Sequence, residues 1–306
     1  MFQFAAIASG AANLPREECV GGEGSLKQFT AADGERIAYR DEGAGRPVVL
    51  LHGLMAHSGF FASQAALAGD FRLISIDLRG HGASRAAGGA LTVRQLAEDV
   101  AGIAESLDLQ GAVGIGWSLG ASVLWHVLAG PTGSRFAGAV VVDMTARVMN
   151  CGDWQLGLSP EACDARTAAI AEDFETFAAA AGQAIFAQPI GEDFRDRADW
   201  ASLEFARNDP AAIGSLWASL MGQDFRALLR RIRQPTLIVR GAHSQLYGGA
   251  TADHLAAVLP DARIVEFAAS GHAPHVEEPD KFNATIRAFA ESLSRAPETR
   301  TTQMMN

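Results

Sequence analysis

Short runs of consecutive apolar residues alternate with stretches of helical spacing along most of this chain. Four such runs precede residue 144, and each is long enough for one buried strand. Strands that are apolar on both faces are typical of parallel sheets, which carry helices on both sides. The alternation therefore predicts an α/β protein with a doubly wound, mostly parallel sheet. The four predicted strands are Pro47–Leu51, Phe71–Asp77, Ala112–Gly116 and Phe136–Asp143.

A hairpin is expected ahead of these strands, and helices are expected between them. The segment Lys27–Glu42 contains Asp33 and Gly34, a pair that favours a two-residue hairpin turn. Apolar residues recur with helical spacing in two segments, Val93–Leu107 and Leu119–Leu128. The second of these helices begins directly after a predicted strand.

The alternation stops at residue 145 and resumes at residue 234. Between these points the sequence has helical stretches rich in aromatic residues and no convincing strand. Residues 145–233 are therefore predicted to form a helical cap over the sheet edge. The core is predicted from residues 25–144 and 234–294, with flexible tails at 1–24 and 295–306. The second part of the core is predicted to contain strands Pro235–Arg240 and Arg263–Phe267 and helices Thr251–Val258 and Asp280–Leu293.

Composition excludes several classes of protein. Of 306 residues, 48% are hydrophobic and 20% charged, which is the balance of a globular chain and not of a disordered one. The net charge of −10 provides no overall basic surface for nucleic acid and no polybasic membrane patch. No apolar run reaches the roughly 18 residues of a membrane-spanning helix. Because the N-terminal segment lacks a basic start and the three cysteines lack disulfide or metal spacing, a cytoplasmic location is expected.

The segment Gly116–Gly120, with the sequence GWSLG, lies between an apolar strand and an apolar helix. This is the context of a nucleophile elbow, in which a serine occupies a sharp strand-to-helix turn. Glycines on both sides allow the two arms of such a turn to approach closely. Ser118 is therefore the candidate nucleophile, and the alternative is an ordinary buried serine in a tight turn.

A second loop at the same sheet edge follows the strand Pro47–Leu51 and has the sequence HGLM. An oxyanion hole requires two backbone N–H groups that point to the developing negative charge. The N–H groups of Leu54 and Leu119 are in position to supply them. His52 is interpreted as a structural residue that braces this loop.

Two histidines in the segment SGHAPHVE are candidates for the general base. His272 lies just beyond a predicted strand, on a loop that can reach the nucleophile at the same edge, and is preferred. His275 is expected to pack at the start of the final helix. The glycine-rich loop DLRGHGAS is interpreted as structural, so that Asp77 and His81 receive no catalytic role.

In type and order, these motifs resemble those of the α/β-hydrolase fold superfamily. The HG loop, the DLRGHGxS loop, the elbow and the GHxPHxExP histidine loop follow that family's order over roughly residues 26–293. The resemblance implies an eight-stranded sheet, a Ser-His-acid triad and a substrate cleft between the sheet and the cap. It does not identify the substrate.

The acid of this triad departs from the pattern of many relatives, in which it follows the seventh strand. The matching stretch here is GAHSQ, with Ser244 in the usual place of an aspartate. A neutral hydroxyl cannot stabilise an imidazolium ion as a carboxylate does. Asp143 ends the sixth strand at the same sheet edge and is the preferred acid, as in some groups of this fold. Asp253, which lies within a predicted helix, is the second choice.

These residues predict a serine hydrolase that cleaves a carboxylic ester or lactone of a small apolar molecule through an acyl-enzyme. Hydrolysis of an amide or carbon–carbon bond and a non-catalytic small-molecule receptor of the same fold are the alternatives. Neither a metal nor an organic cofactor is expected, no nucleic acid or membrane partner is expected, and the oligomeric state is left open. The side chains expected to contact the substrate are Met55, Phe60, Trp117, Met144, Trp154 and Trp217.

Overall fold

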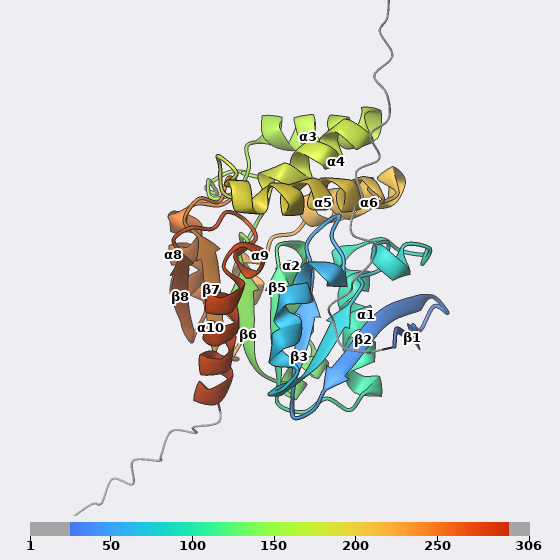
Figure 1. Cartoon of the computed structure of the whole chain (residues 1–306), viewed down its shortest axis with the longest axis vertical. Coiled ribbons are helices and arrows are strands. Elements are labelled where there is room, and N and C mark those ends of the chain that lie inside the picture. The colour runs from blue at the N-terminus through green and yellow to red at the C-terminus, as the bar shows by residue number, and fades with distance from the viewer. Residues whose placement is uncertain (1–24, 294–306) are drawn as a thin grey trace, which may run out of the picture.

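The computed structural model describes residues 25–293, which form an eight-stranded sheet with the order β1-β2-β4-β3-β5-β6-β7-β8 (Figure 1). Strand β2 is antiparallel to β1 and β4, and all the other neighbouring strands are parallel. The predicted fold class is confirmed, whereas the predicted tails lie outside the described residues. The strands are β1 (Lys27–Thr30), β2 (Arg36–Gly43), β3 (Arg46–Leu51), β4 (Phe71–Ile76), β5 (Ala112–Trp117), β6 (Phe136–Val142), β7 (Thr236–Gly241) and β8 (Ala262–Phe267).

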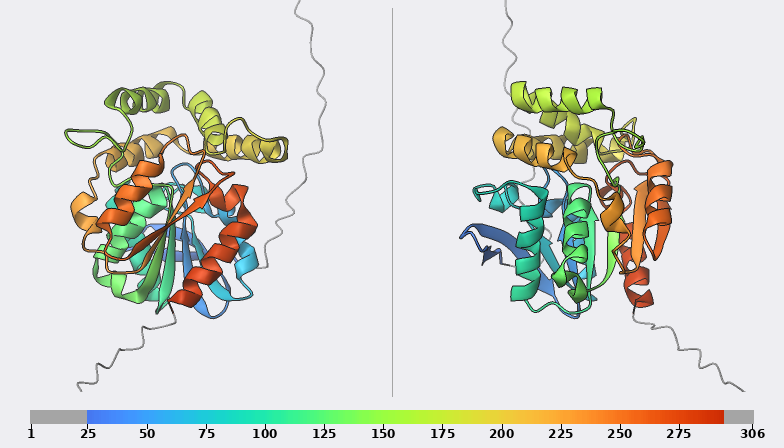
Figure 2. Two further views of the ribbon diagram at one scale, coloured as in Figure 1. Left: turned by 90° about the vertical axis from the view of Figure 1, so that its left-hand side faces the viewer. Right: turned by 180° about the vertical axis from the view of Figure 1, so that it is seen from behind.

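Helices cover both faces of this sheet, as expected for parallel strands with apolar side chains on both sides. Figure 2 shows α1, α2 and α8 on one face, and Figure 1 shows α10 on the other. No helix within residues 25–293 combines the length and the apolar character needed to cross a membrane. The α-helices are α1 (Val93–Ser106), α2 (Leu119–Ala129), α3 (Pro160–Glu172), α4 (Phe174–Ala184), α5 (Arg195–Ala206), α6 (Pro210–Met221), α7 (Arg226–Leu229), α8 (Gly249–Val258), α9 (Pro274–Glu277) and α10 (Pro279–Ser292). Short 3-10 helices are η1 (Ser58–Leu67), η2 (Gly82–Ser84), η3 (Pro131–Arg135) and η4 (Glu192–Phe194).

The hairpin between β1 and β2 differs from the prediction in its turn. The N–H of Ala31 donates to the carbonyl of Glu35 at 2.8 Å, so that Ala32, Asp33 and Gly34 all lie in the turn. Gly34 has φ +88°, a left-handed conformation that glycine adopts without steric cost. A loop of this length closes with a glycine at its last position, and the predicted two-residue turn was therefore wrong by one residue.

The loop after β4 is held by a network of charged groups around a buried arginine. Arg79 is fully buried, and its guanidinium donates to Asp99 on α1 at 2.8 Å and to Asp33 in the hairpin turn at 2.7 Å. Asp77 accepts hydrogen bonds from two backbone N–H groups, at 2.7 and 2.8 Å. Each of these side chains is occupied in joining parts of the core, which supports the structural interpretation of this loop.

Residues 145–233, called the insert from here on, connect β6 to its neighbour β7. Helices α3 to α6 of the insert lie beyond the ends of the parallel strands (Figure 1). The stretch before α3 is irregular and contains two isolated β-bridges, between Met149 and Leu158 and between Cys151 and Trp154. The carboxyl ends of β3, β5, β6 and β7 therefore meet the insert at one edge of the sheet.

Candidate active site

Ser118 occupies the turn between β5 and α2 in a strained backbone conformation. Its φ is +52° and its ψ is −118°, a combination that is costly for a residue with a side chain. A Cβ atom on Gly116 would lie 2.5 Å from the carbonyl oxygen of Gly120, and one on Gly120 would lie 2.1 Å from that of Leu51. Both positions accept only glycine, and the turn presents the half-buried Ser118 at the sheet edge.

The HG loop lies directly beside this serine. A Cβ atom on Gly53 would be 3.3 Å from Cβ of Ser118, so that the two backbones are in close contact. Leu54 follows Gly53 in this loop, and Leu119 is the first residue of α2. The first N–H groups of a helix have no partner within the helix, which leaves that of Leu119 free to bind an anion.

His52 holds the HG loop in place through contacts of both its ring nitrogens. Its Nδ1 lies 2.8 Å from the carbonyl oxygen of Gly53, and its Nε2 accepts a hydrogen bond from the N–H of Leu78 at 2.9 Å. Because Nε2 is an acceptor, Nδ1 carries the proton and donates to Gly53. Burial lowers the pKa of His52 to about 3, so that the ring is neutral. These contacts support the structural role expected for His52.

His272 and Asp143 meet at the same edge of the sheet. Nδ1 of His272 lies 2.7 Å from Oδ2 of Asp143, and both side chains are almost completely buried. Asp143 directly follows β6 and has φ +44°, a left-handed conformation that is uncommon for a residue with a side chain. A carboxylate in contact with Nδ1 fixes the tautomer in which Nε2 can accept a proton. Among residues 25–293, no hydrogen bond joins Ser118 to His272, a contact that often tightens only when substrate binds.

Ser244 and Asp253, the other residues considered for the acid position, lie in different surroundings. The hydroxyl of Ser244 lies 2.5 Å from Oδ2 of Asp143. Asp253 is exposed on α8. The structure thus brings Ser244, but not Asp253, to the carboxylate that contacts His272.

Trp117 packs between the elbow and the histidine loop. Its indole Nε1 donates to the carbonyl oxygen of His272 at 2.8 Å, and its ring centroid is 4.7 Å from that of His275. His275 is fully buried on α9, and neither of its ring nitrogens has a hydrogen-bond partner within the described part of the chain. Burial lowers the pKa of His275 to about 3, which keeps the ring neutral.

The insert contacts the loop that carries Leu54. The side-chain amide of Asn208, between α5 and α6, donates to the carbonyl oxygen of Met55 at 2.7 Å. Met55 has φ +67°, a left-handed conformation that is uncommon for a residue with a side chain. Asn208 thereby links the insert to a constrained position next to Leu54.

The insert also contacts the histidine loop. The carboxylate of Glu277 accepts hydrogen bonds from the N–H of Ala187 in the insert and from the N–H of Gly271, both at 2.7 Å. Burial raises the pKa of Glu277 to about 7, against the opposite effect of these two donors. The N–H of Ala273 donates to the carbonyl of Ile185 at 3.1 Å. The loop on either side of His272 is therefore bound to the segment after α4.

An aromatic cluster extends from the elbow toward the surface. The ring of Phe60 lies 5.8 Å from Trp117 and 4.5 Å from Trp200 on α5, measured between centroids. Trp200 is 37% exposed, whereas Phe60 and Trp117 are buried. Trp200 was not among the expected substrate contacts, because nothing in the sequence distinguishes it from the other aromatic residues of the insert.

The two tryptophans of the insert that were expected to contact the substrate pack against other side chains. Trp154 donates to the carbonyl of Arg147 at 2.8 Å, and its ring lies 4.8 Å from that of His254 on α8. Trp217 donates to Oγ1 of Thr167 at 2.9 Å. Contact of these residues, and of the buried Met144 after Asp143, with a substrate stays a prediction.

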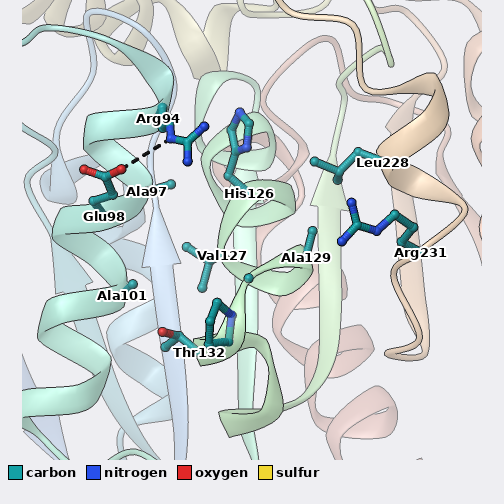
Figure 3. A pocket seen from close by; sticks show the side chains of 12 residues that line it. Arg94, Ala97, Glu98, Ala101, His126, Val127, Ala129, Thr132, Leu228 and Arg231 are labelled. Atoms are coloured by element: carbon teal, nitrogen blue, oxygen red, sulfur yellow. Dashed lines mark hydrogen bonds and ion pairs between the residues drawn. The ribbon is translucent and has the colours of Figure 1, made fainter.

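A cavity of about 360 Å³ lies away from these residues, between α1, α2 and α7 (Figure 3). It is lined by Arg94 and Glu98, which form an ion pair at 3.4 Å, and by His126 and Arg231. None of the residues that line this cavity belongs to the elbow, the HG loop or the histidine loop. Within residues 25–293, His, Cys, Asp and Glu side chains nowhere gather in groups of three that could hold a metal ion.

Known proteins resemble this chain in sequence and in fold. Residues 48–285 match the model of the alpha/beta hydrolase family. The pimeloyl-[acyl-carrier protein] methyl ester esterase of Nitrosomonas europaea is 30% identical, over 83% of this chain and 99% of that protein. An esterase from Exiguobacterium antarcticum has the same fold, with a TM-score of 0.81 and 24% identity over 87% of this chain and 99% of that one.

A second solved structure is similar at a slightly higher identity. The enol-lactonase from Burkholderia xenovorans superposes with a TM-score of 0.77 and 26% identity, over 87% of this chain and the whole of that one. The resemblance inferred from the motifs is confirmed by these matches. The chain belongs to the alpha/beta hydrolase family.

Proposed function

We propose that this protein is a serine hydrolase that cleaves a carboxylic ester or lactone of a small apolar molecule. The observation that carries this proposal is the 2.7 Å contact between His272 and Asp143 at the sheet edge where Ser118 occupies a strained elbow. An ester hydrolase and an enol-lactonase among the relatives support an acyl–oxygen bond as the target.

In the proposed mechanism, His272 takes the proton of Ser118 as its oxygen attacks the substrate carbonyl. Asp143 keeps the imidazole in the required tautomer and stabilises its positive charge. The N–H groups of Leu54 and Leu119 bind the oxyanion of the tetrahedral intermediate. The leaving alcohol takes the proton from His272. His272 then takes a proton from water, which attacks the acyl-enzyme, and the proton returns to Ser118 as the acyl group is released.

We also propose that the insert is the cap that selects the substrate. Its hydrogen bonds to the loops around Leu54 and His272 support this proposal. Met55 and Met144 lie in the loops next to the proposed triad, Phe60 lies in η1 and Trp117 ends β5. Apolar side chains at these positions favour an apolar substrate portion. Trp154 and Trp217 would influence substrate selection through the packing of the insert.

A fluorophosphonate probe tests the nucleophile without knowledge of the substrate, because it reacts with an activated serine. Wild-type protein should be labelled once per chain, and Ser118→Ala should not be labelled. Ser122→Ala is a matched control, since Ser122 lies one turn further along α2 and its buried hydroxyl has no hydrogen-bond partner among residues 25–293. Labelling of Ser118→Ala would exclude this serine as the nucleophile.

Turnover of p-nitrophenyl esters separates an enzyme from a receptor of the same fold. Ser118→Ala and His272→Ala should each lower kcat by roughly 10³-fold or more, because the two residues act as a unit. His275→Ala should cost far less. A single turnover combined with a large increase in stability on ligand binding would instead indicate a receptor.

A further inference from the structure

Ser244 stands at the end of β7, where many relatives carry the triad acid, and it contacts the acid that this chain uses in its place. Its Oγ lies 2.5 Å from Oδ2 of Asp143. The same Oδ2 lies 2.7 Å from Nδ1 of His272. One carboxylate oxygen therefore receives a hydrogen bond from each side, from the base and from the serine.

The surroundings of Ser244 determine where its proton points. The backbone N–H groups of Leu246 and Tyr247 point to Oγ at 3.3 and 3.4 Å. A hydroxyl has one proton to donate and two lone pairs to accept with. Because both lone pairs face N–H donors, the proton is directed to Asp143.

The backbone of Asp143 is fixed, which leaves its side-chain torsions to be set by contacts. Its N–H donates to the carbonyl of Val239 at 2.9 Å, and its φ of +44° is unusual for an aspartate. Ser244 and His272 are the residues that hydrogen-bond to its carboxylate among residues 25–293. Without the hydroxyl, only the histidine would orient the carboxylate.

We propose that Ser244 is a positioning residue for the triad acid, holding Oδ2 of Asp143 against Nδ1 of His272. This inference rests on the proposed function, in which Asp143 is the acid and His272 the base. The hydroxyl acts in two ways. It restricts the carboxylate to one orientation, and it withdraws negative charge from the oxygen that faces the imidazole.

The second effect predicts a change in the pH dependence of the reaction. More negative charge on Oδ2 favours the protonated imidazole, so that removing the hydroxyl should move the loss of activity at low pH to a higher pH. The other titratable groups near His272 are Tyr247 after β7, His275 on α9 and Glu277, which binds the N–H of Gly271. The substitution leaves the contacts of His275 and Glu277 in place and removes only a backbone contact of Tyr247, at 3.4 Å.

The experiment compares the kcat/KM–pH profiles of wild type, Ser244→Ala and Ser244→Thr with a p-nitrophenyl ester. Ser244→Ala should lower kcat roughly tenfold, the loss of one hydrogen bond to a charged group, and raise the acidic midpoint by about half a unit to one unit. Ser244→Thr retains a hydroxyl and should restore both values toward wild type. Thr132→Ala is the matched control, because it removes a hydroxyl that donates to the carboxylate of Glu105 at 2.6 Å away from the proposed site, and its acidic midpoint should not move.

A double-mutant cycle tests whether Ser244 acts through Asp143. In an Asp143→Asn background, Ser244→Ala should have no further effect on kcat or on the acidic midpoint. An undiminished tenfold effect there would overturn the inference, as would a wild-type midpoint and kcat in Ser244→Ala. If Ser118→Ala and Asp143→Asn were themselves fully active, the proposed function would fail as well, which is a different result.

An NMR measurement keeps the inference testable if Ser244→Ala proves inactive because of a general disturbance. The His272 Nδ1 proton can be assigned by its loss in Asp143→Asn. In Ser244→Thr its signal should match the wild type, and in Ser244→Ala it should shift. An unchanged signal in Ser244→Ala would show that the hydroxyl does not affect the contact between His272 and Asp143, and would overturn the proposal.

Discussion

The sheet edge and the insert hold the loops of the proposed site by different physical means. At the sheet edge, Ser118 and Asp143 each come one residue after a strand, with φ of +52° and +44°. The backbone of the sheet determines where they lie. The insert reaches the same loops through a few side-chain contacts, such as that of Asn208 to Met55. Chemistry should therefore respond sharply to changes at the edge, and access and specificity should respond gradually to changes in the insert.

The largest difference is expected between two aspartates of the core. Asp143→Asn keeps the shape but removes the charge and permits the wrong imidazole tautomer, and should lower kcat by roughly 10³- to 10⁴-fold. Asp253→Asn changes an exposed residue of α8 and should stay within about tenfold of wild type. Steady-state kinetics on one ester measures both. Equal effects would remove Asp143 from the proposed triad.

A smaller effect is expected where the insert meets the HG loop. Asn208→Ala removes the donor to the Met55 carbonyl, so that the neighbouring N–H of Leu54 is held less firmly, and kcat should fall roughly tenfold with a smaller change in KM. Asn150→Ala is the control, because Asn150 accepts from Gly157 within the insert. If the control had the same effect, the loss would reflect the stability of the insert and not the oxyanion hole.

Trp200→Ala should change the ranking of substrates more than it changes the reactivity of Ser118. Its ring lies 4.5 Å from Phe60, and part of it is exposed, so that it can contact an apolar group of the substrate. Relative kcat/KM values across a panel of acyl and aromatic esters should change by roughly 5- to 10-fold, with fluorophosphonate labelling almost unaffected.

Replacing Trp154 or Trp217 by alanine is also expected to change the ranking of substrates. Together with Trp200→Ala, these variants test how the insert influences specificity. If only Trp200→Ala changes the ranking, specificity depends on the side of the insert that faces η1. If none of the three does, the insert is an appendage and the comparison with the sheet edge fails.

The smallest effect concerns the pH dependence of stability where the insert meets the histidine loop. Burial raises the pKa of Glu277 from 4.5 to about 7 in the folded protein. Between these values the unfolded chain loses the proton while the folded chain keeps it, so that stability from this residue falls as pH rises. The difference in unfolding free energy between wild type and Glu277→Gln should therefore shift against wild type from pH 4.5 to 7 and then remain constant. Urea unfolding at several pH values measures it, and a shift in favour of wild type would mean that the two N–H donors outweigh burial.

Much of the fold and part of the site follow from local sequence. The apolar runs predicted the parallel strands because a strand covered on both faces needs apolar residues at successive positions. The GWSLG segment predicted the elbow because the space at Gly116 is limited by Gly120 and Ala121, only a few positions further along the chain, whereas the space at Gly120 is limited by the distant Leu51. The prediction of the hairpin turn was wrong by one residue, because an Asp-Gly pair can close either a two-residue or a three-residue loop.

The surroundings of the acid depended on the tertiary structure. Sequence favoured Asp143, but it could not show that Ser244, 101 residues away, donates to the same carboxylate. That contact arises because β6 and β7 are paired in register, with Val142, the last residue of β6, opposite Val239, so that Asp143 lies beside the end of β7. The contact of Asn208 with Met55 and the surroundings of Trp154, Trp200 and Trp217 likewise depend on how the insert packs on the core. Turns and strands are specified by nearby residues, whereas contacts between distant segments are decided only when the whole chain has packed.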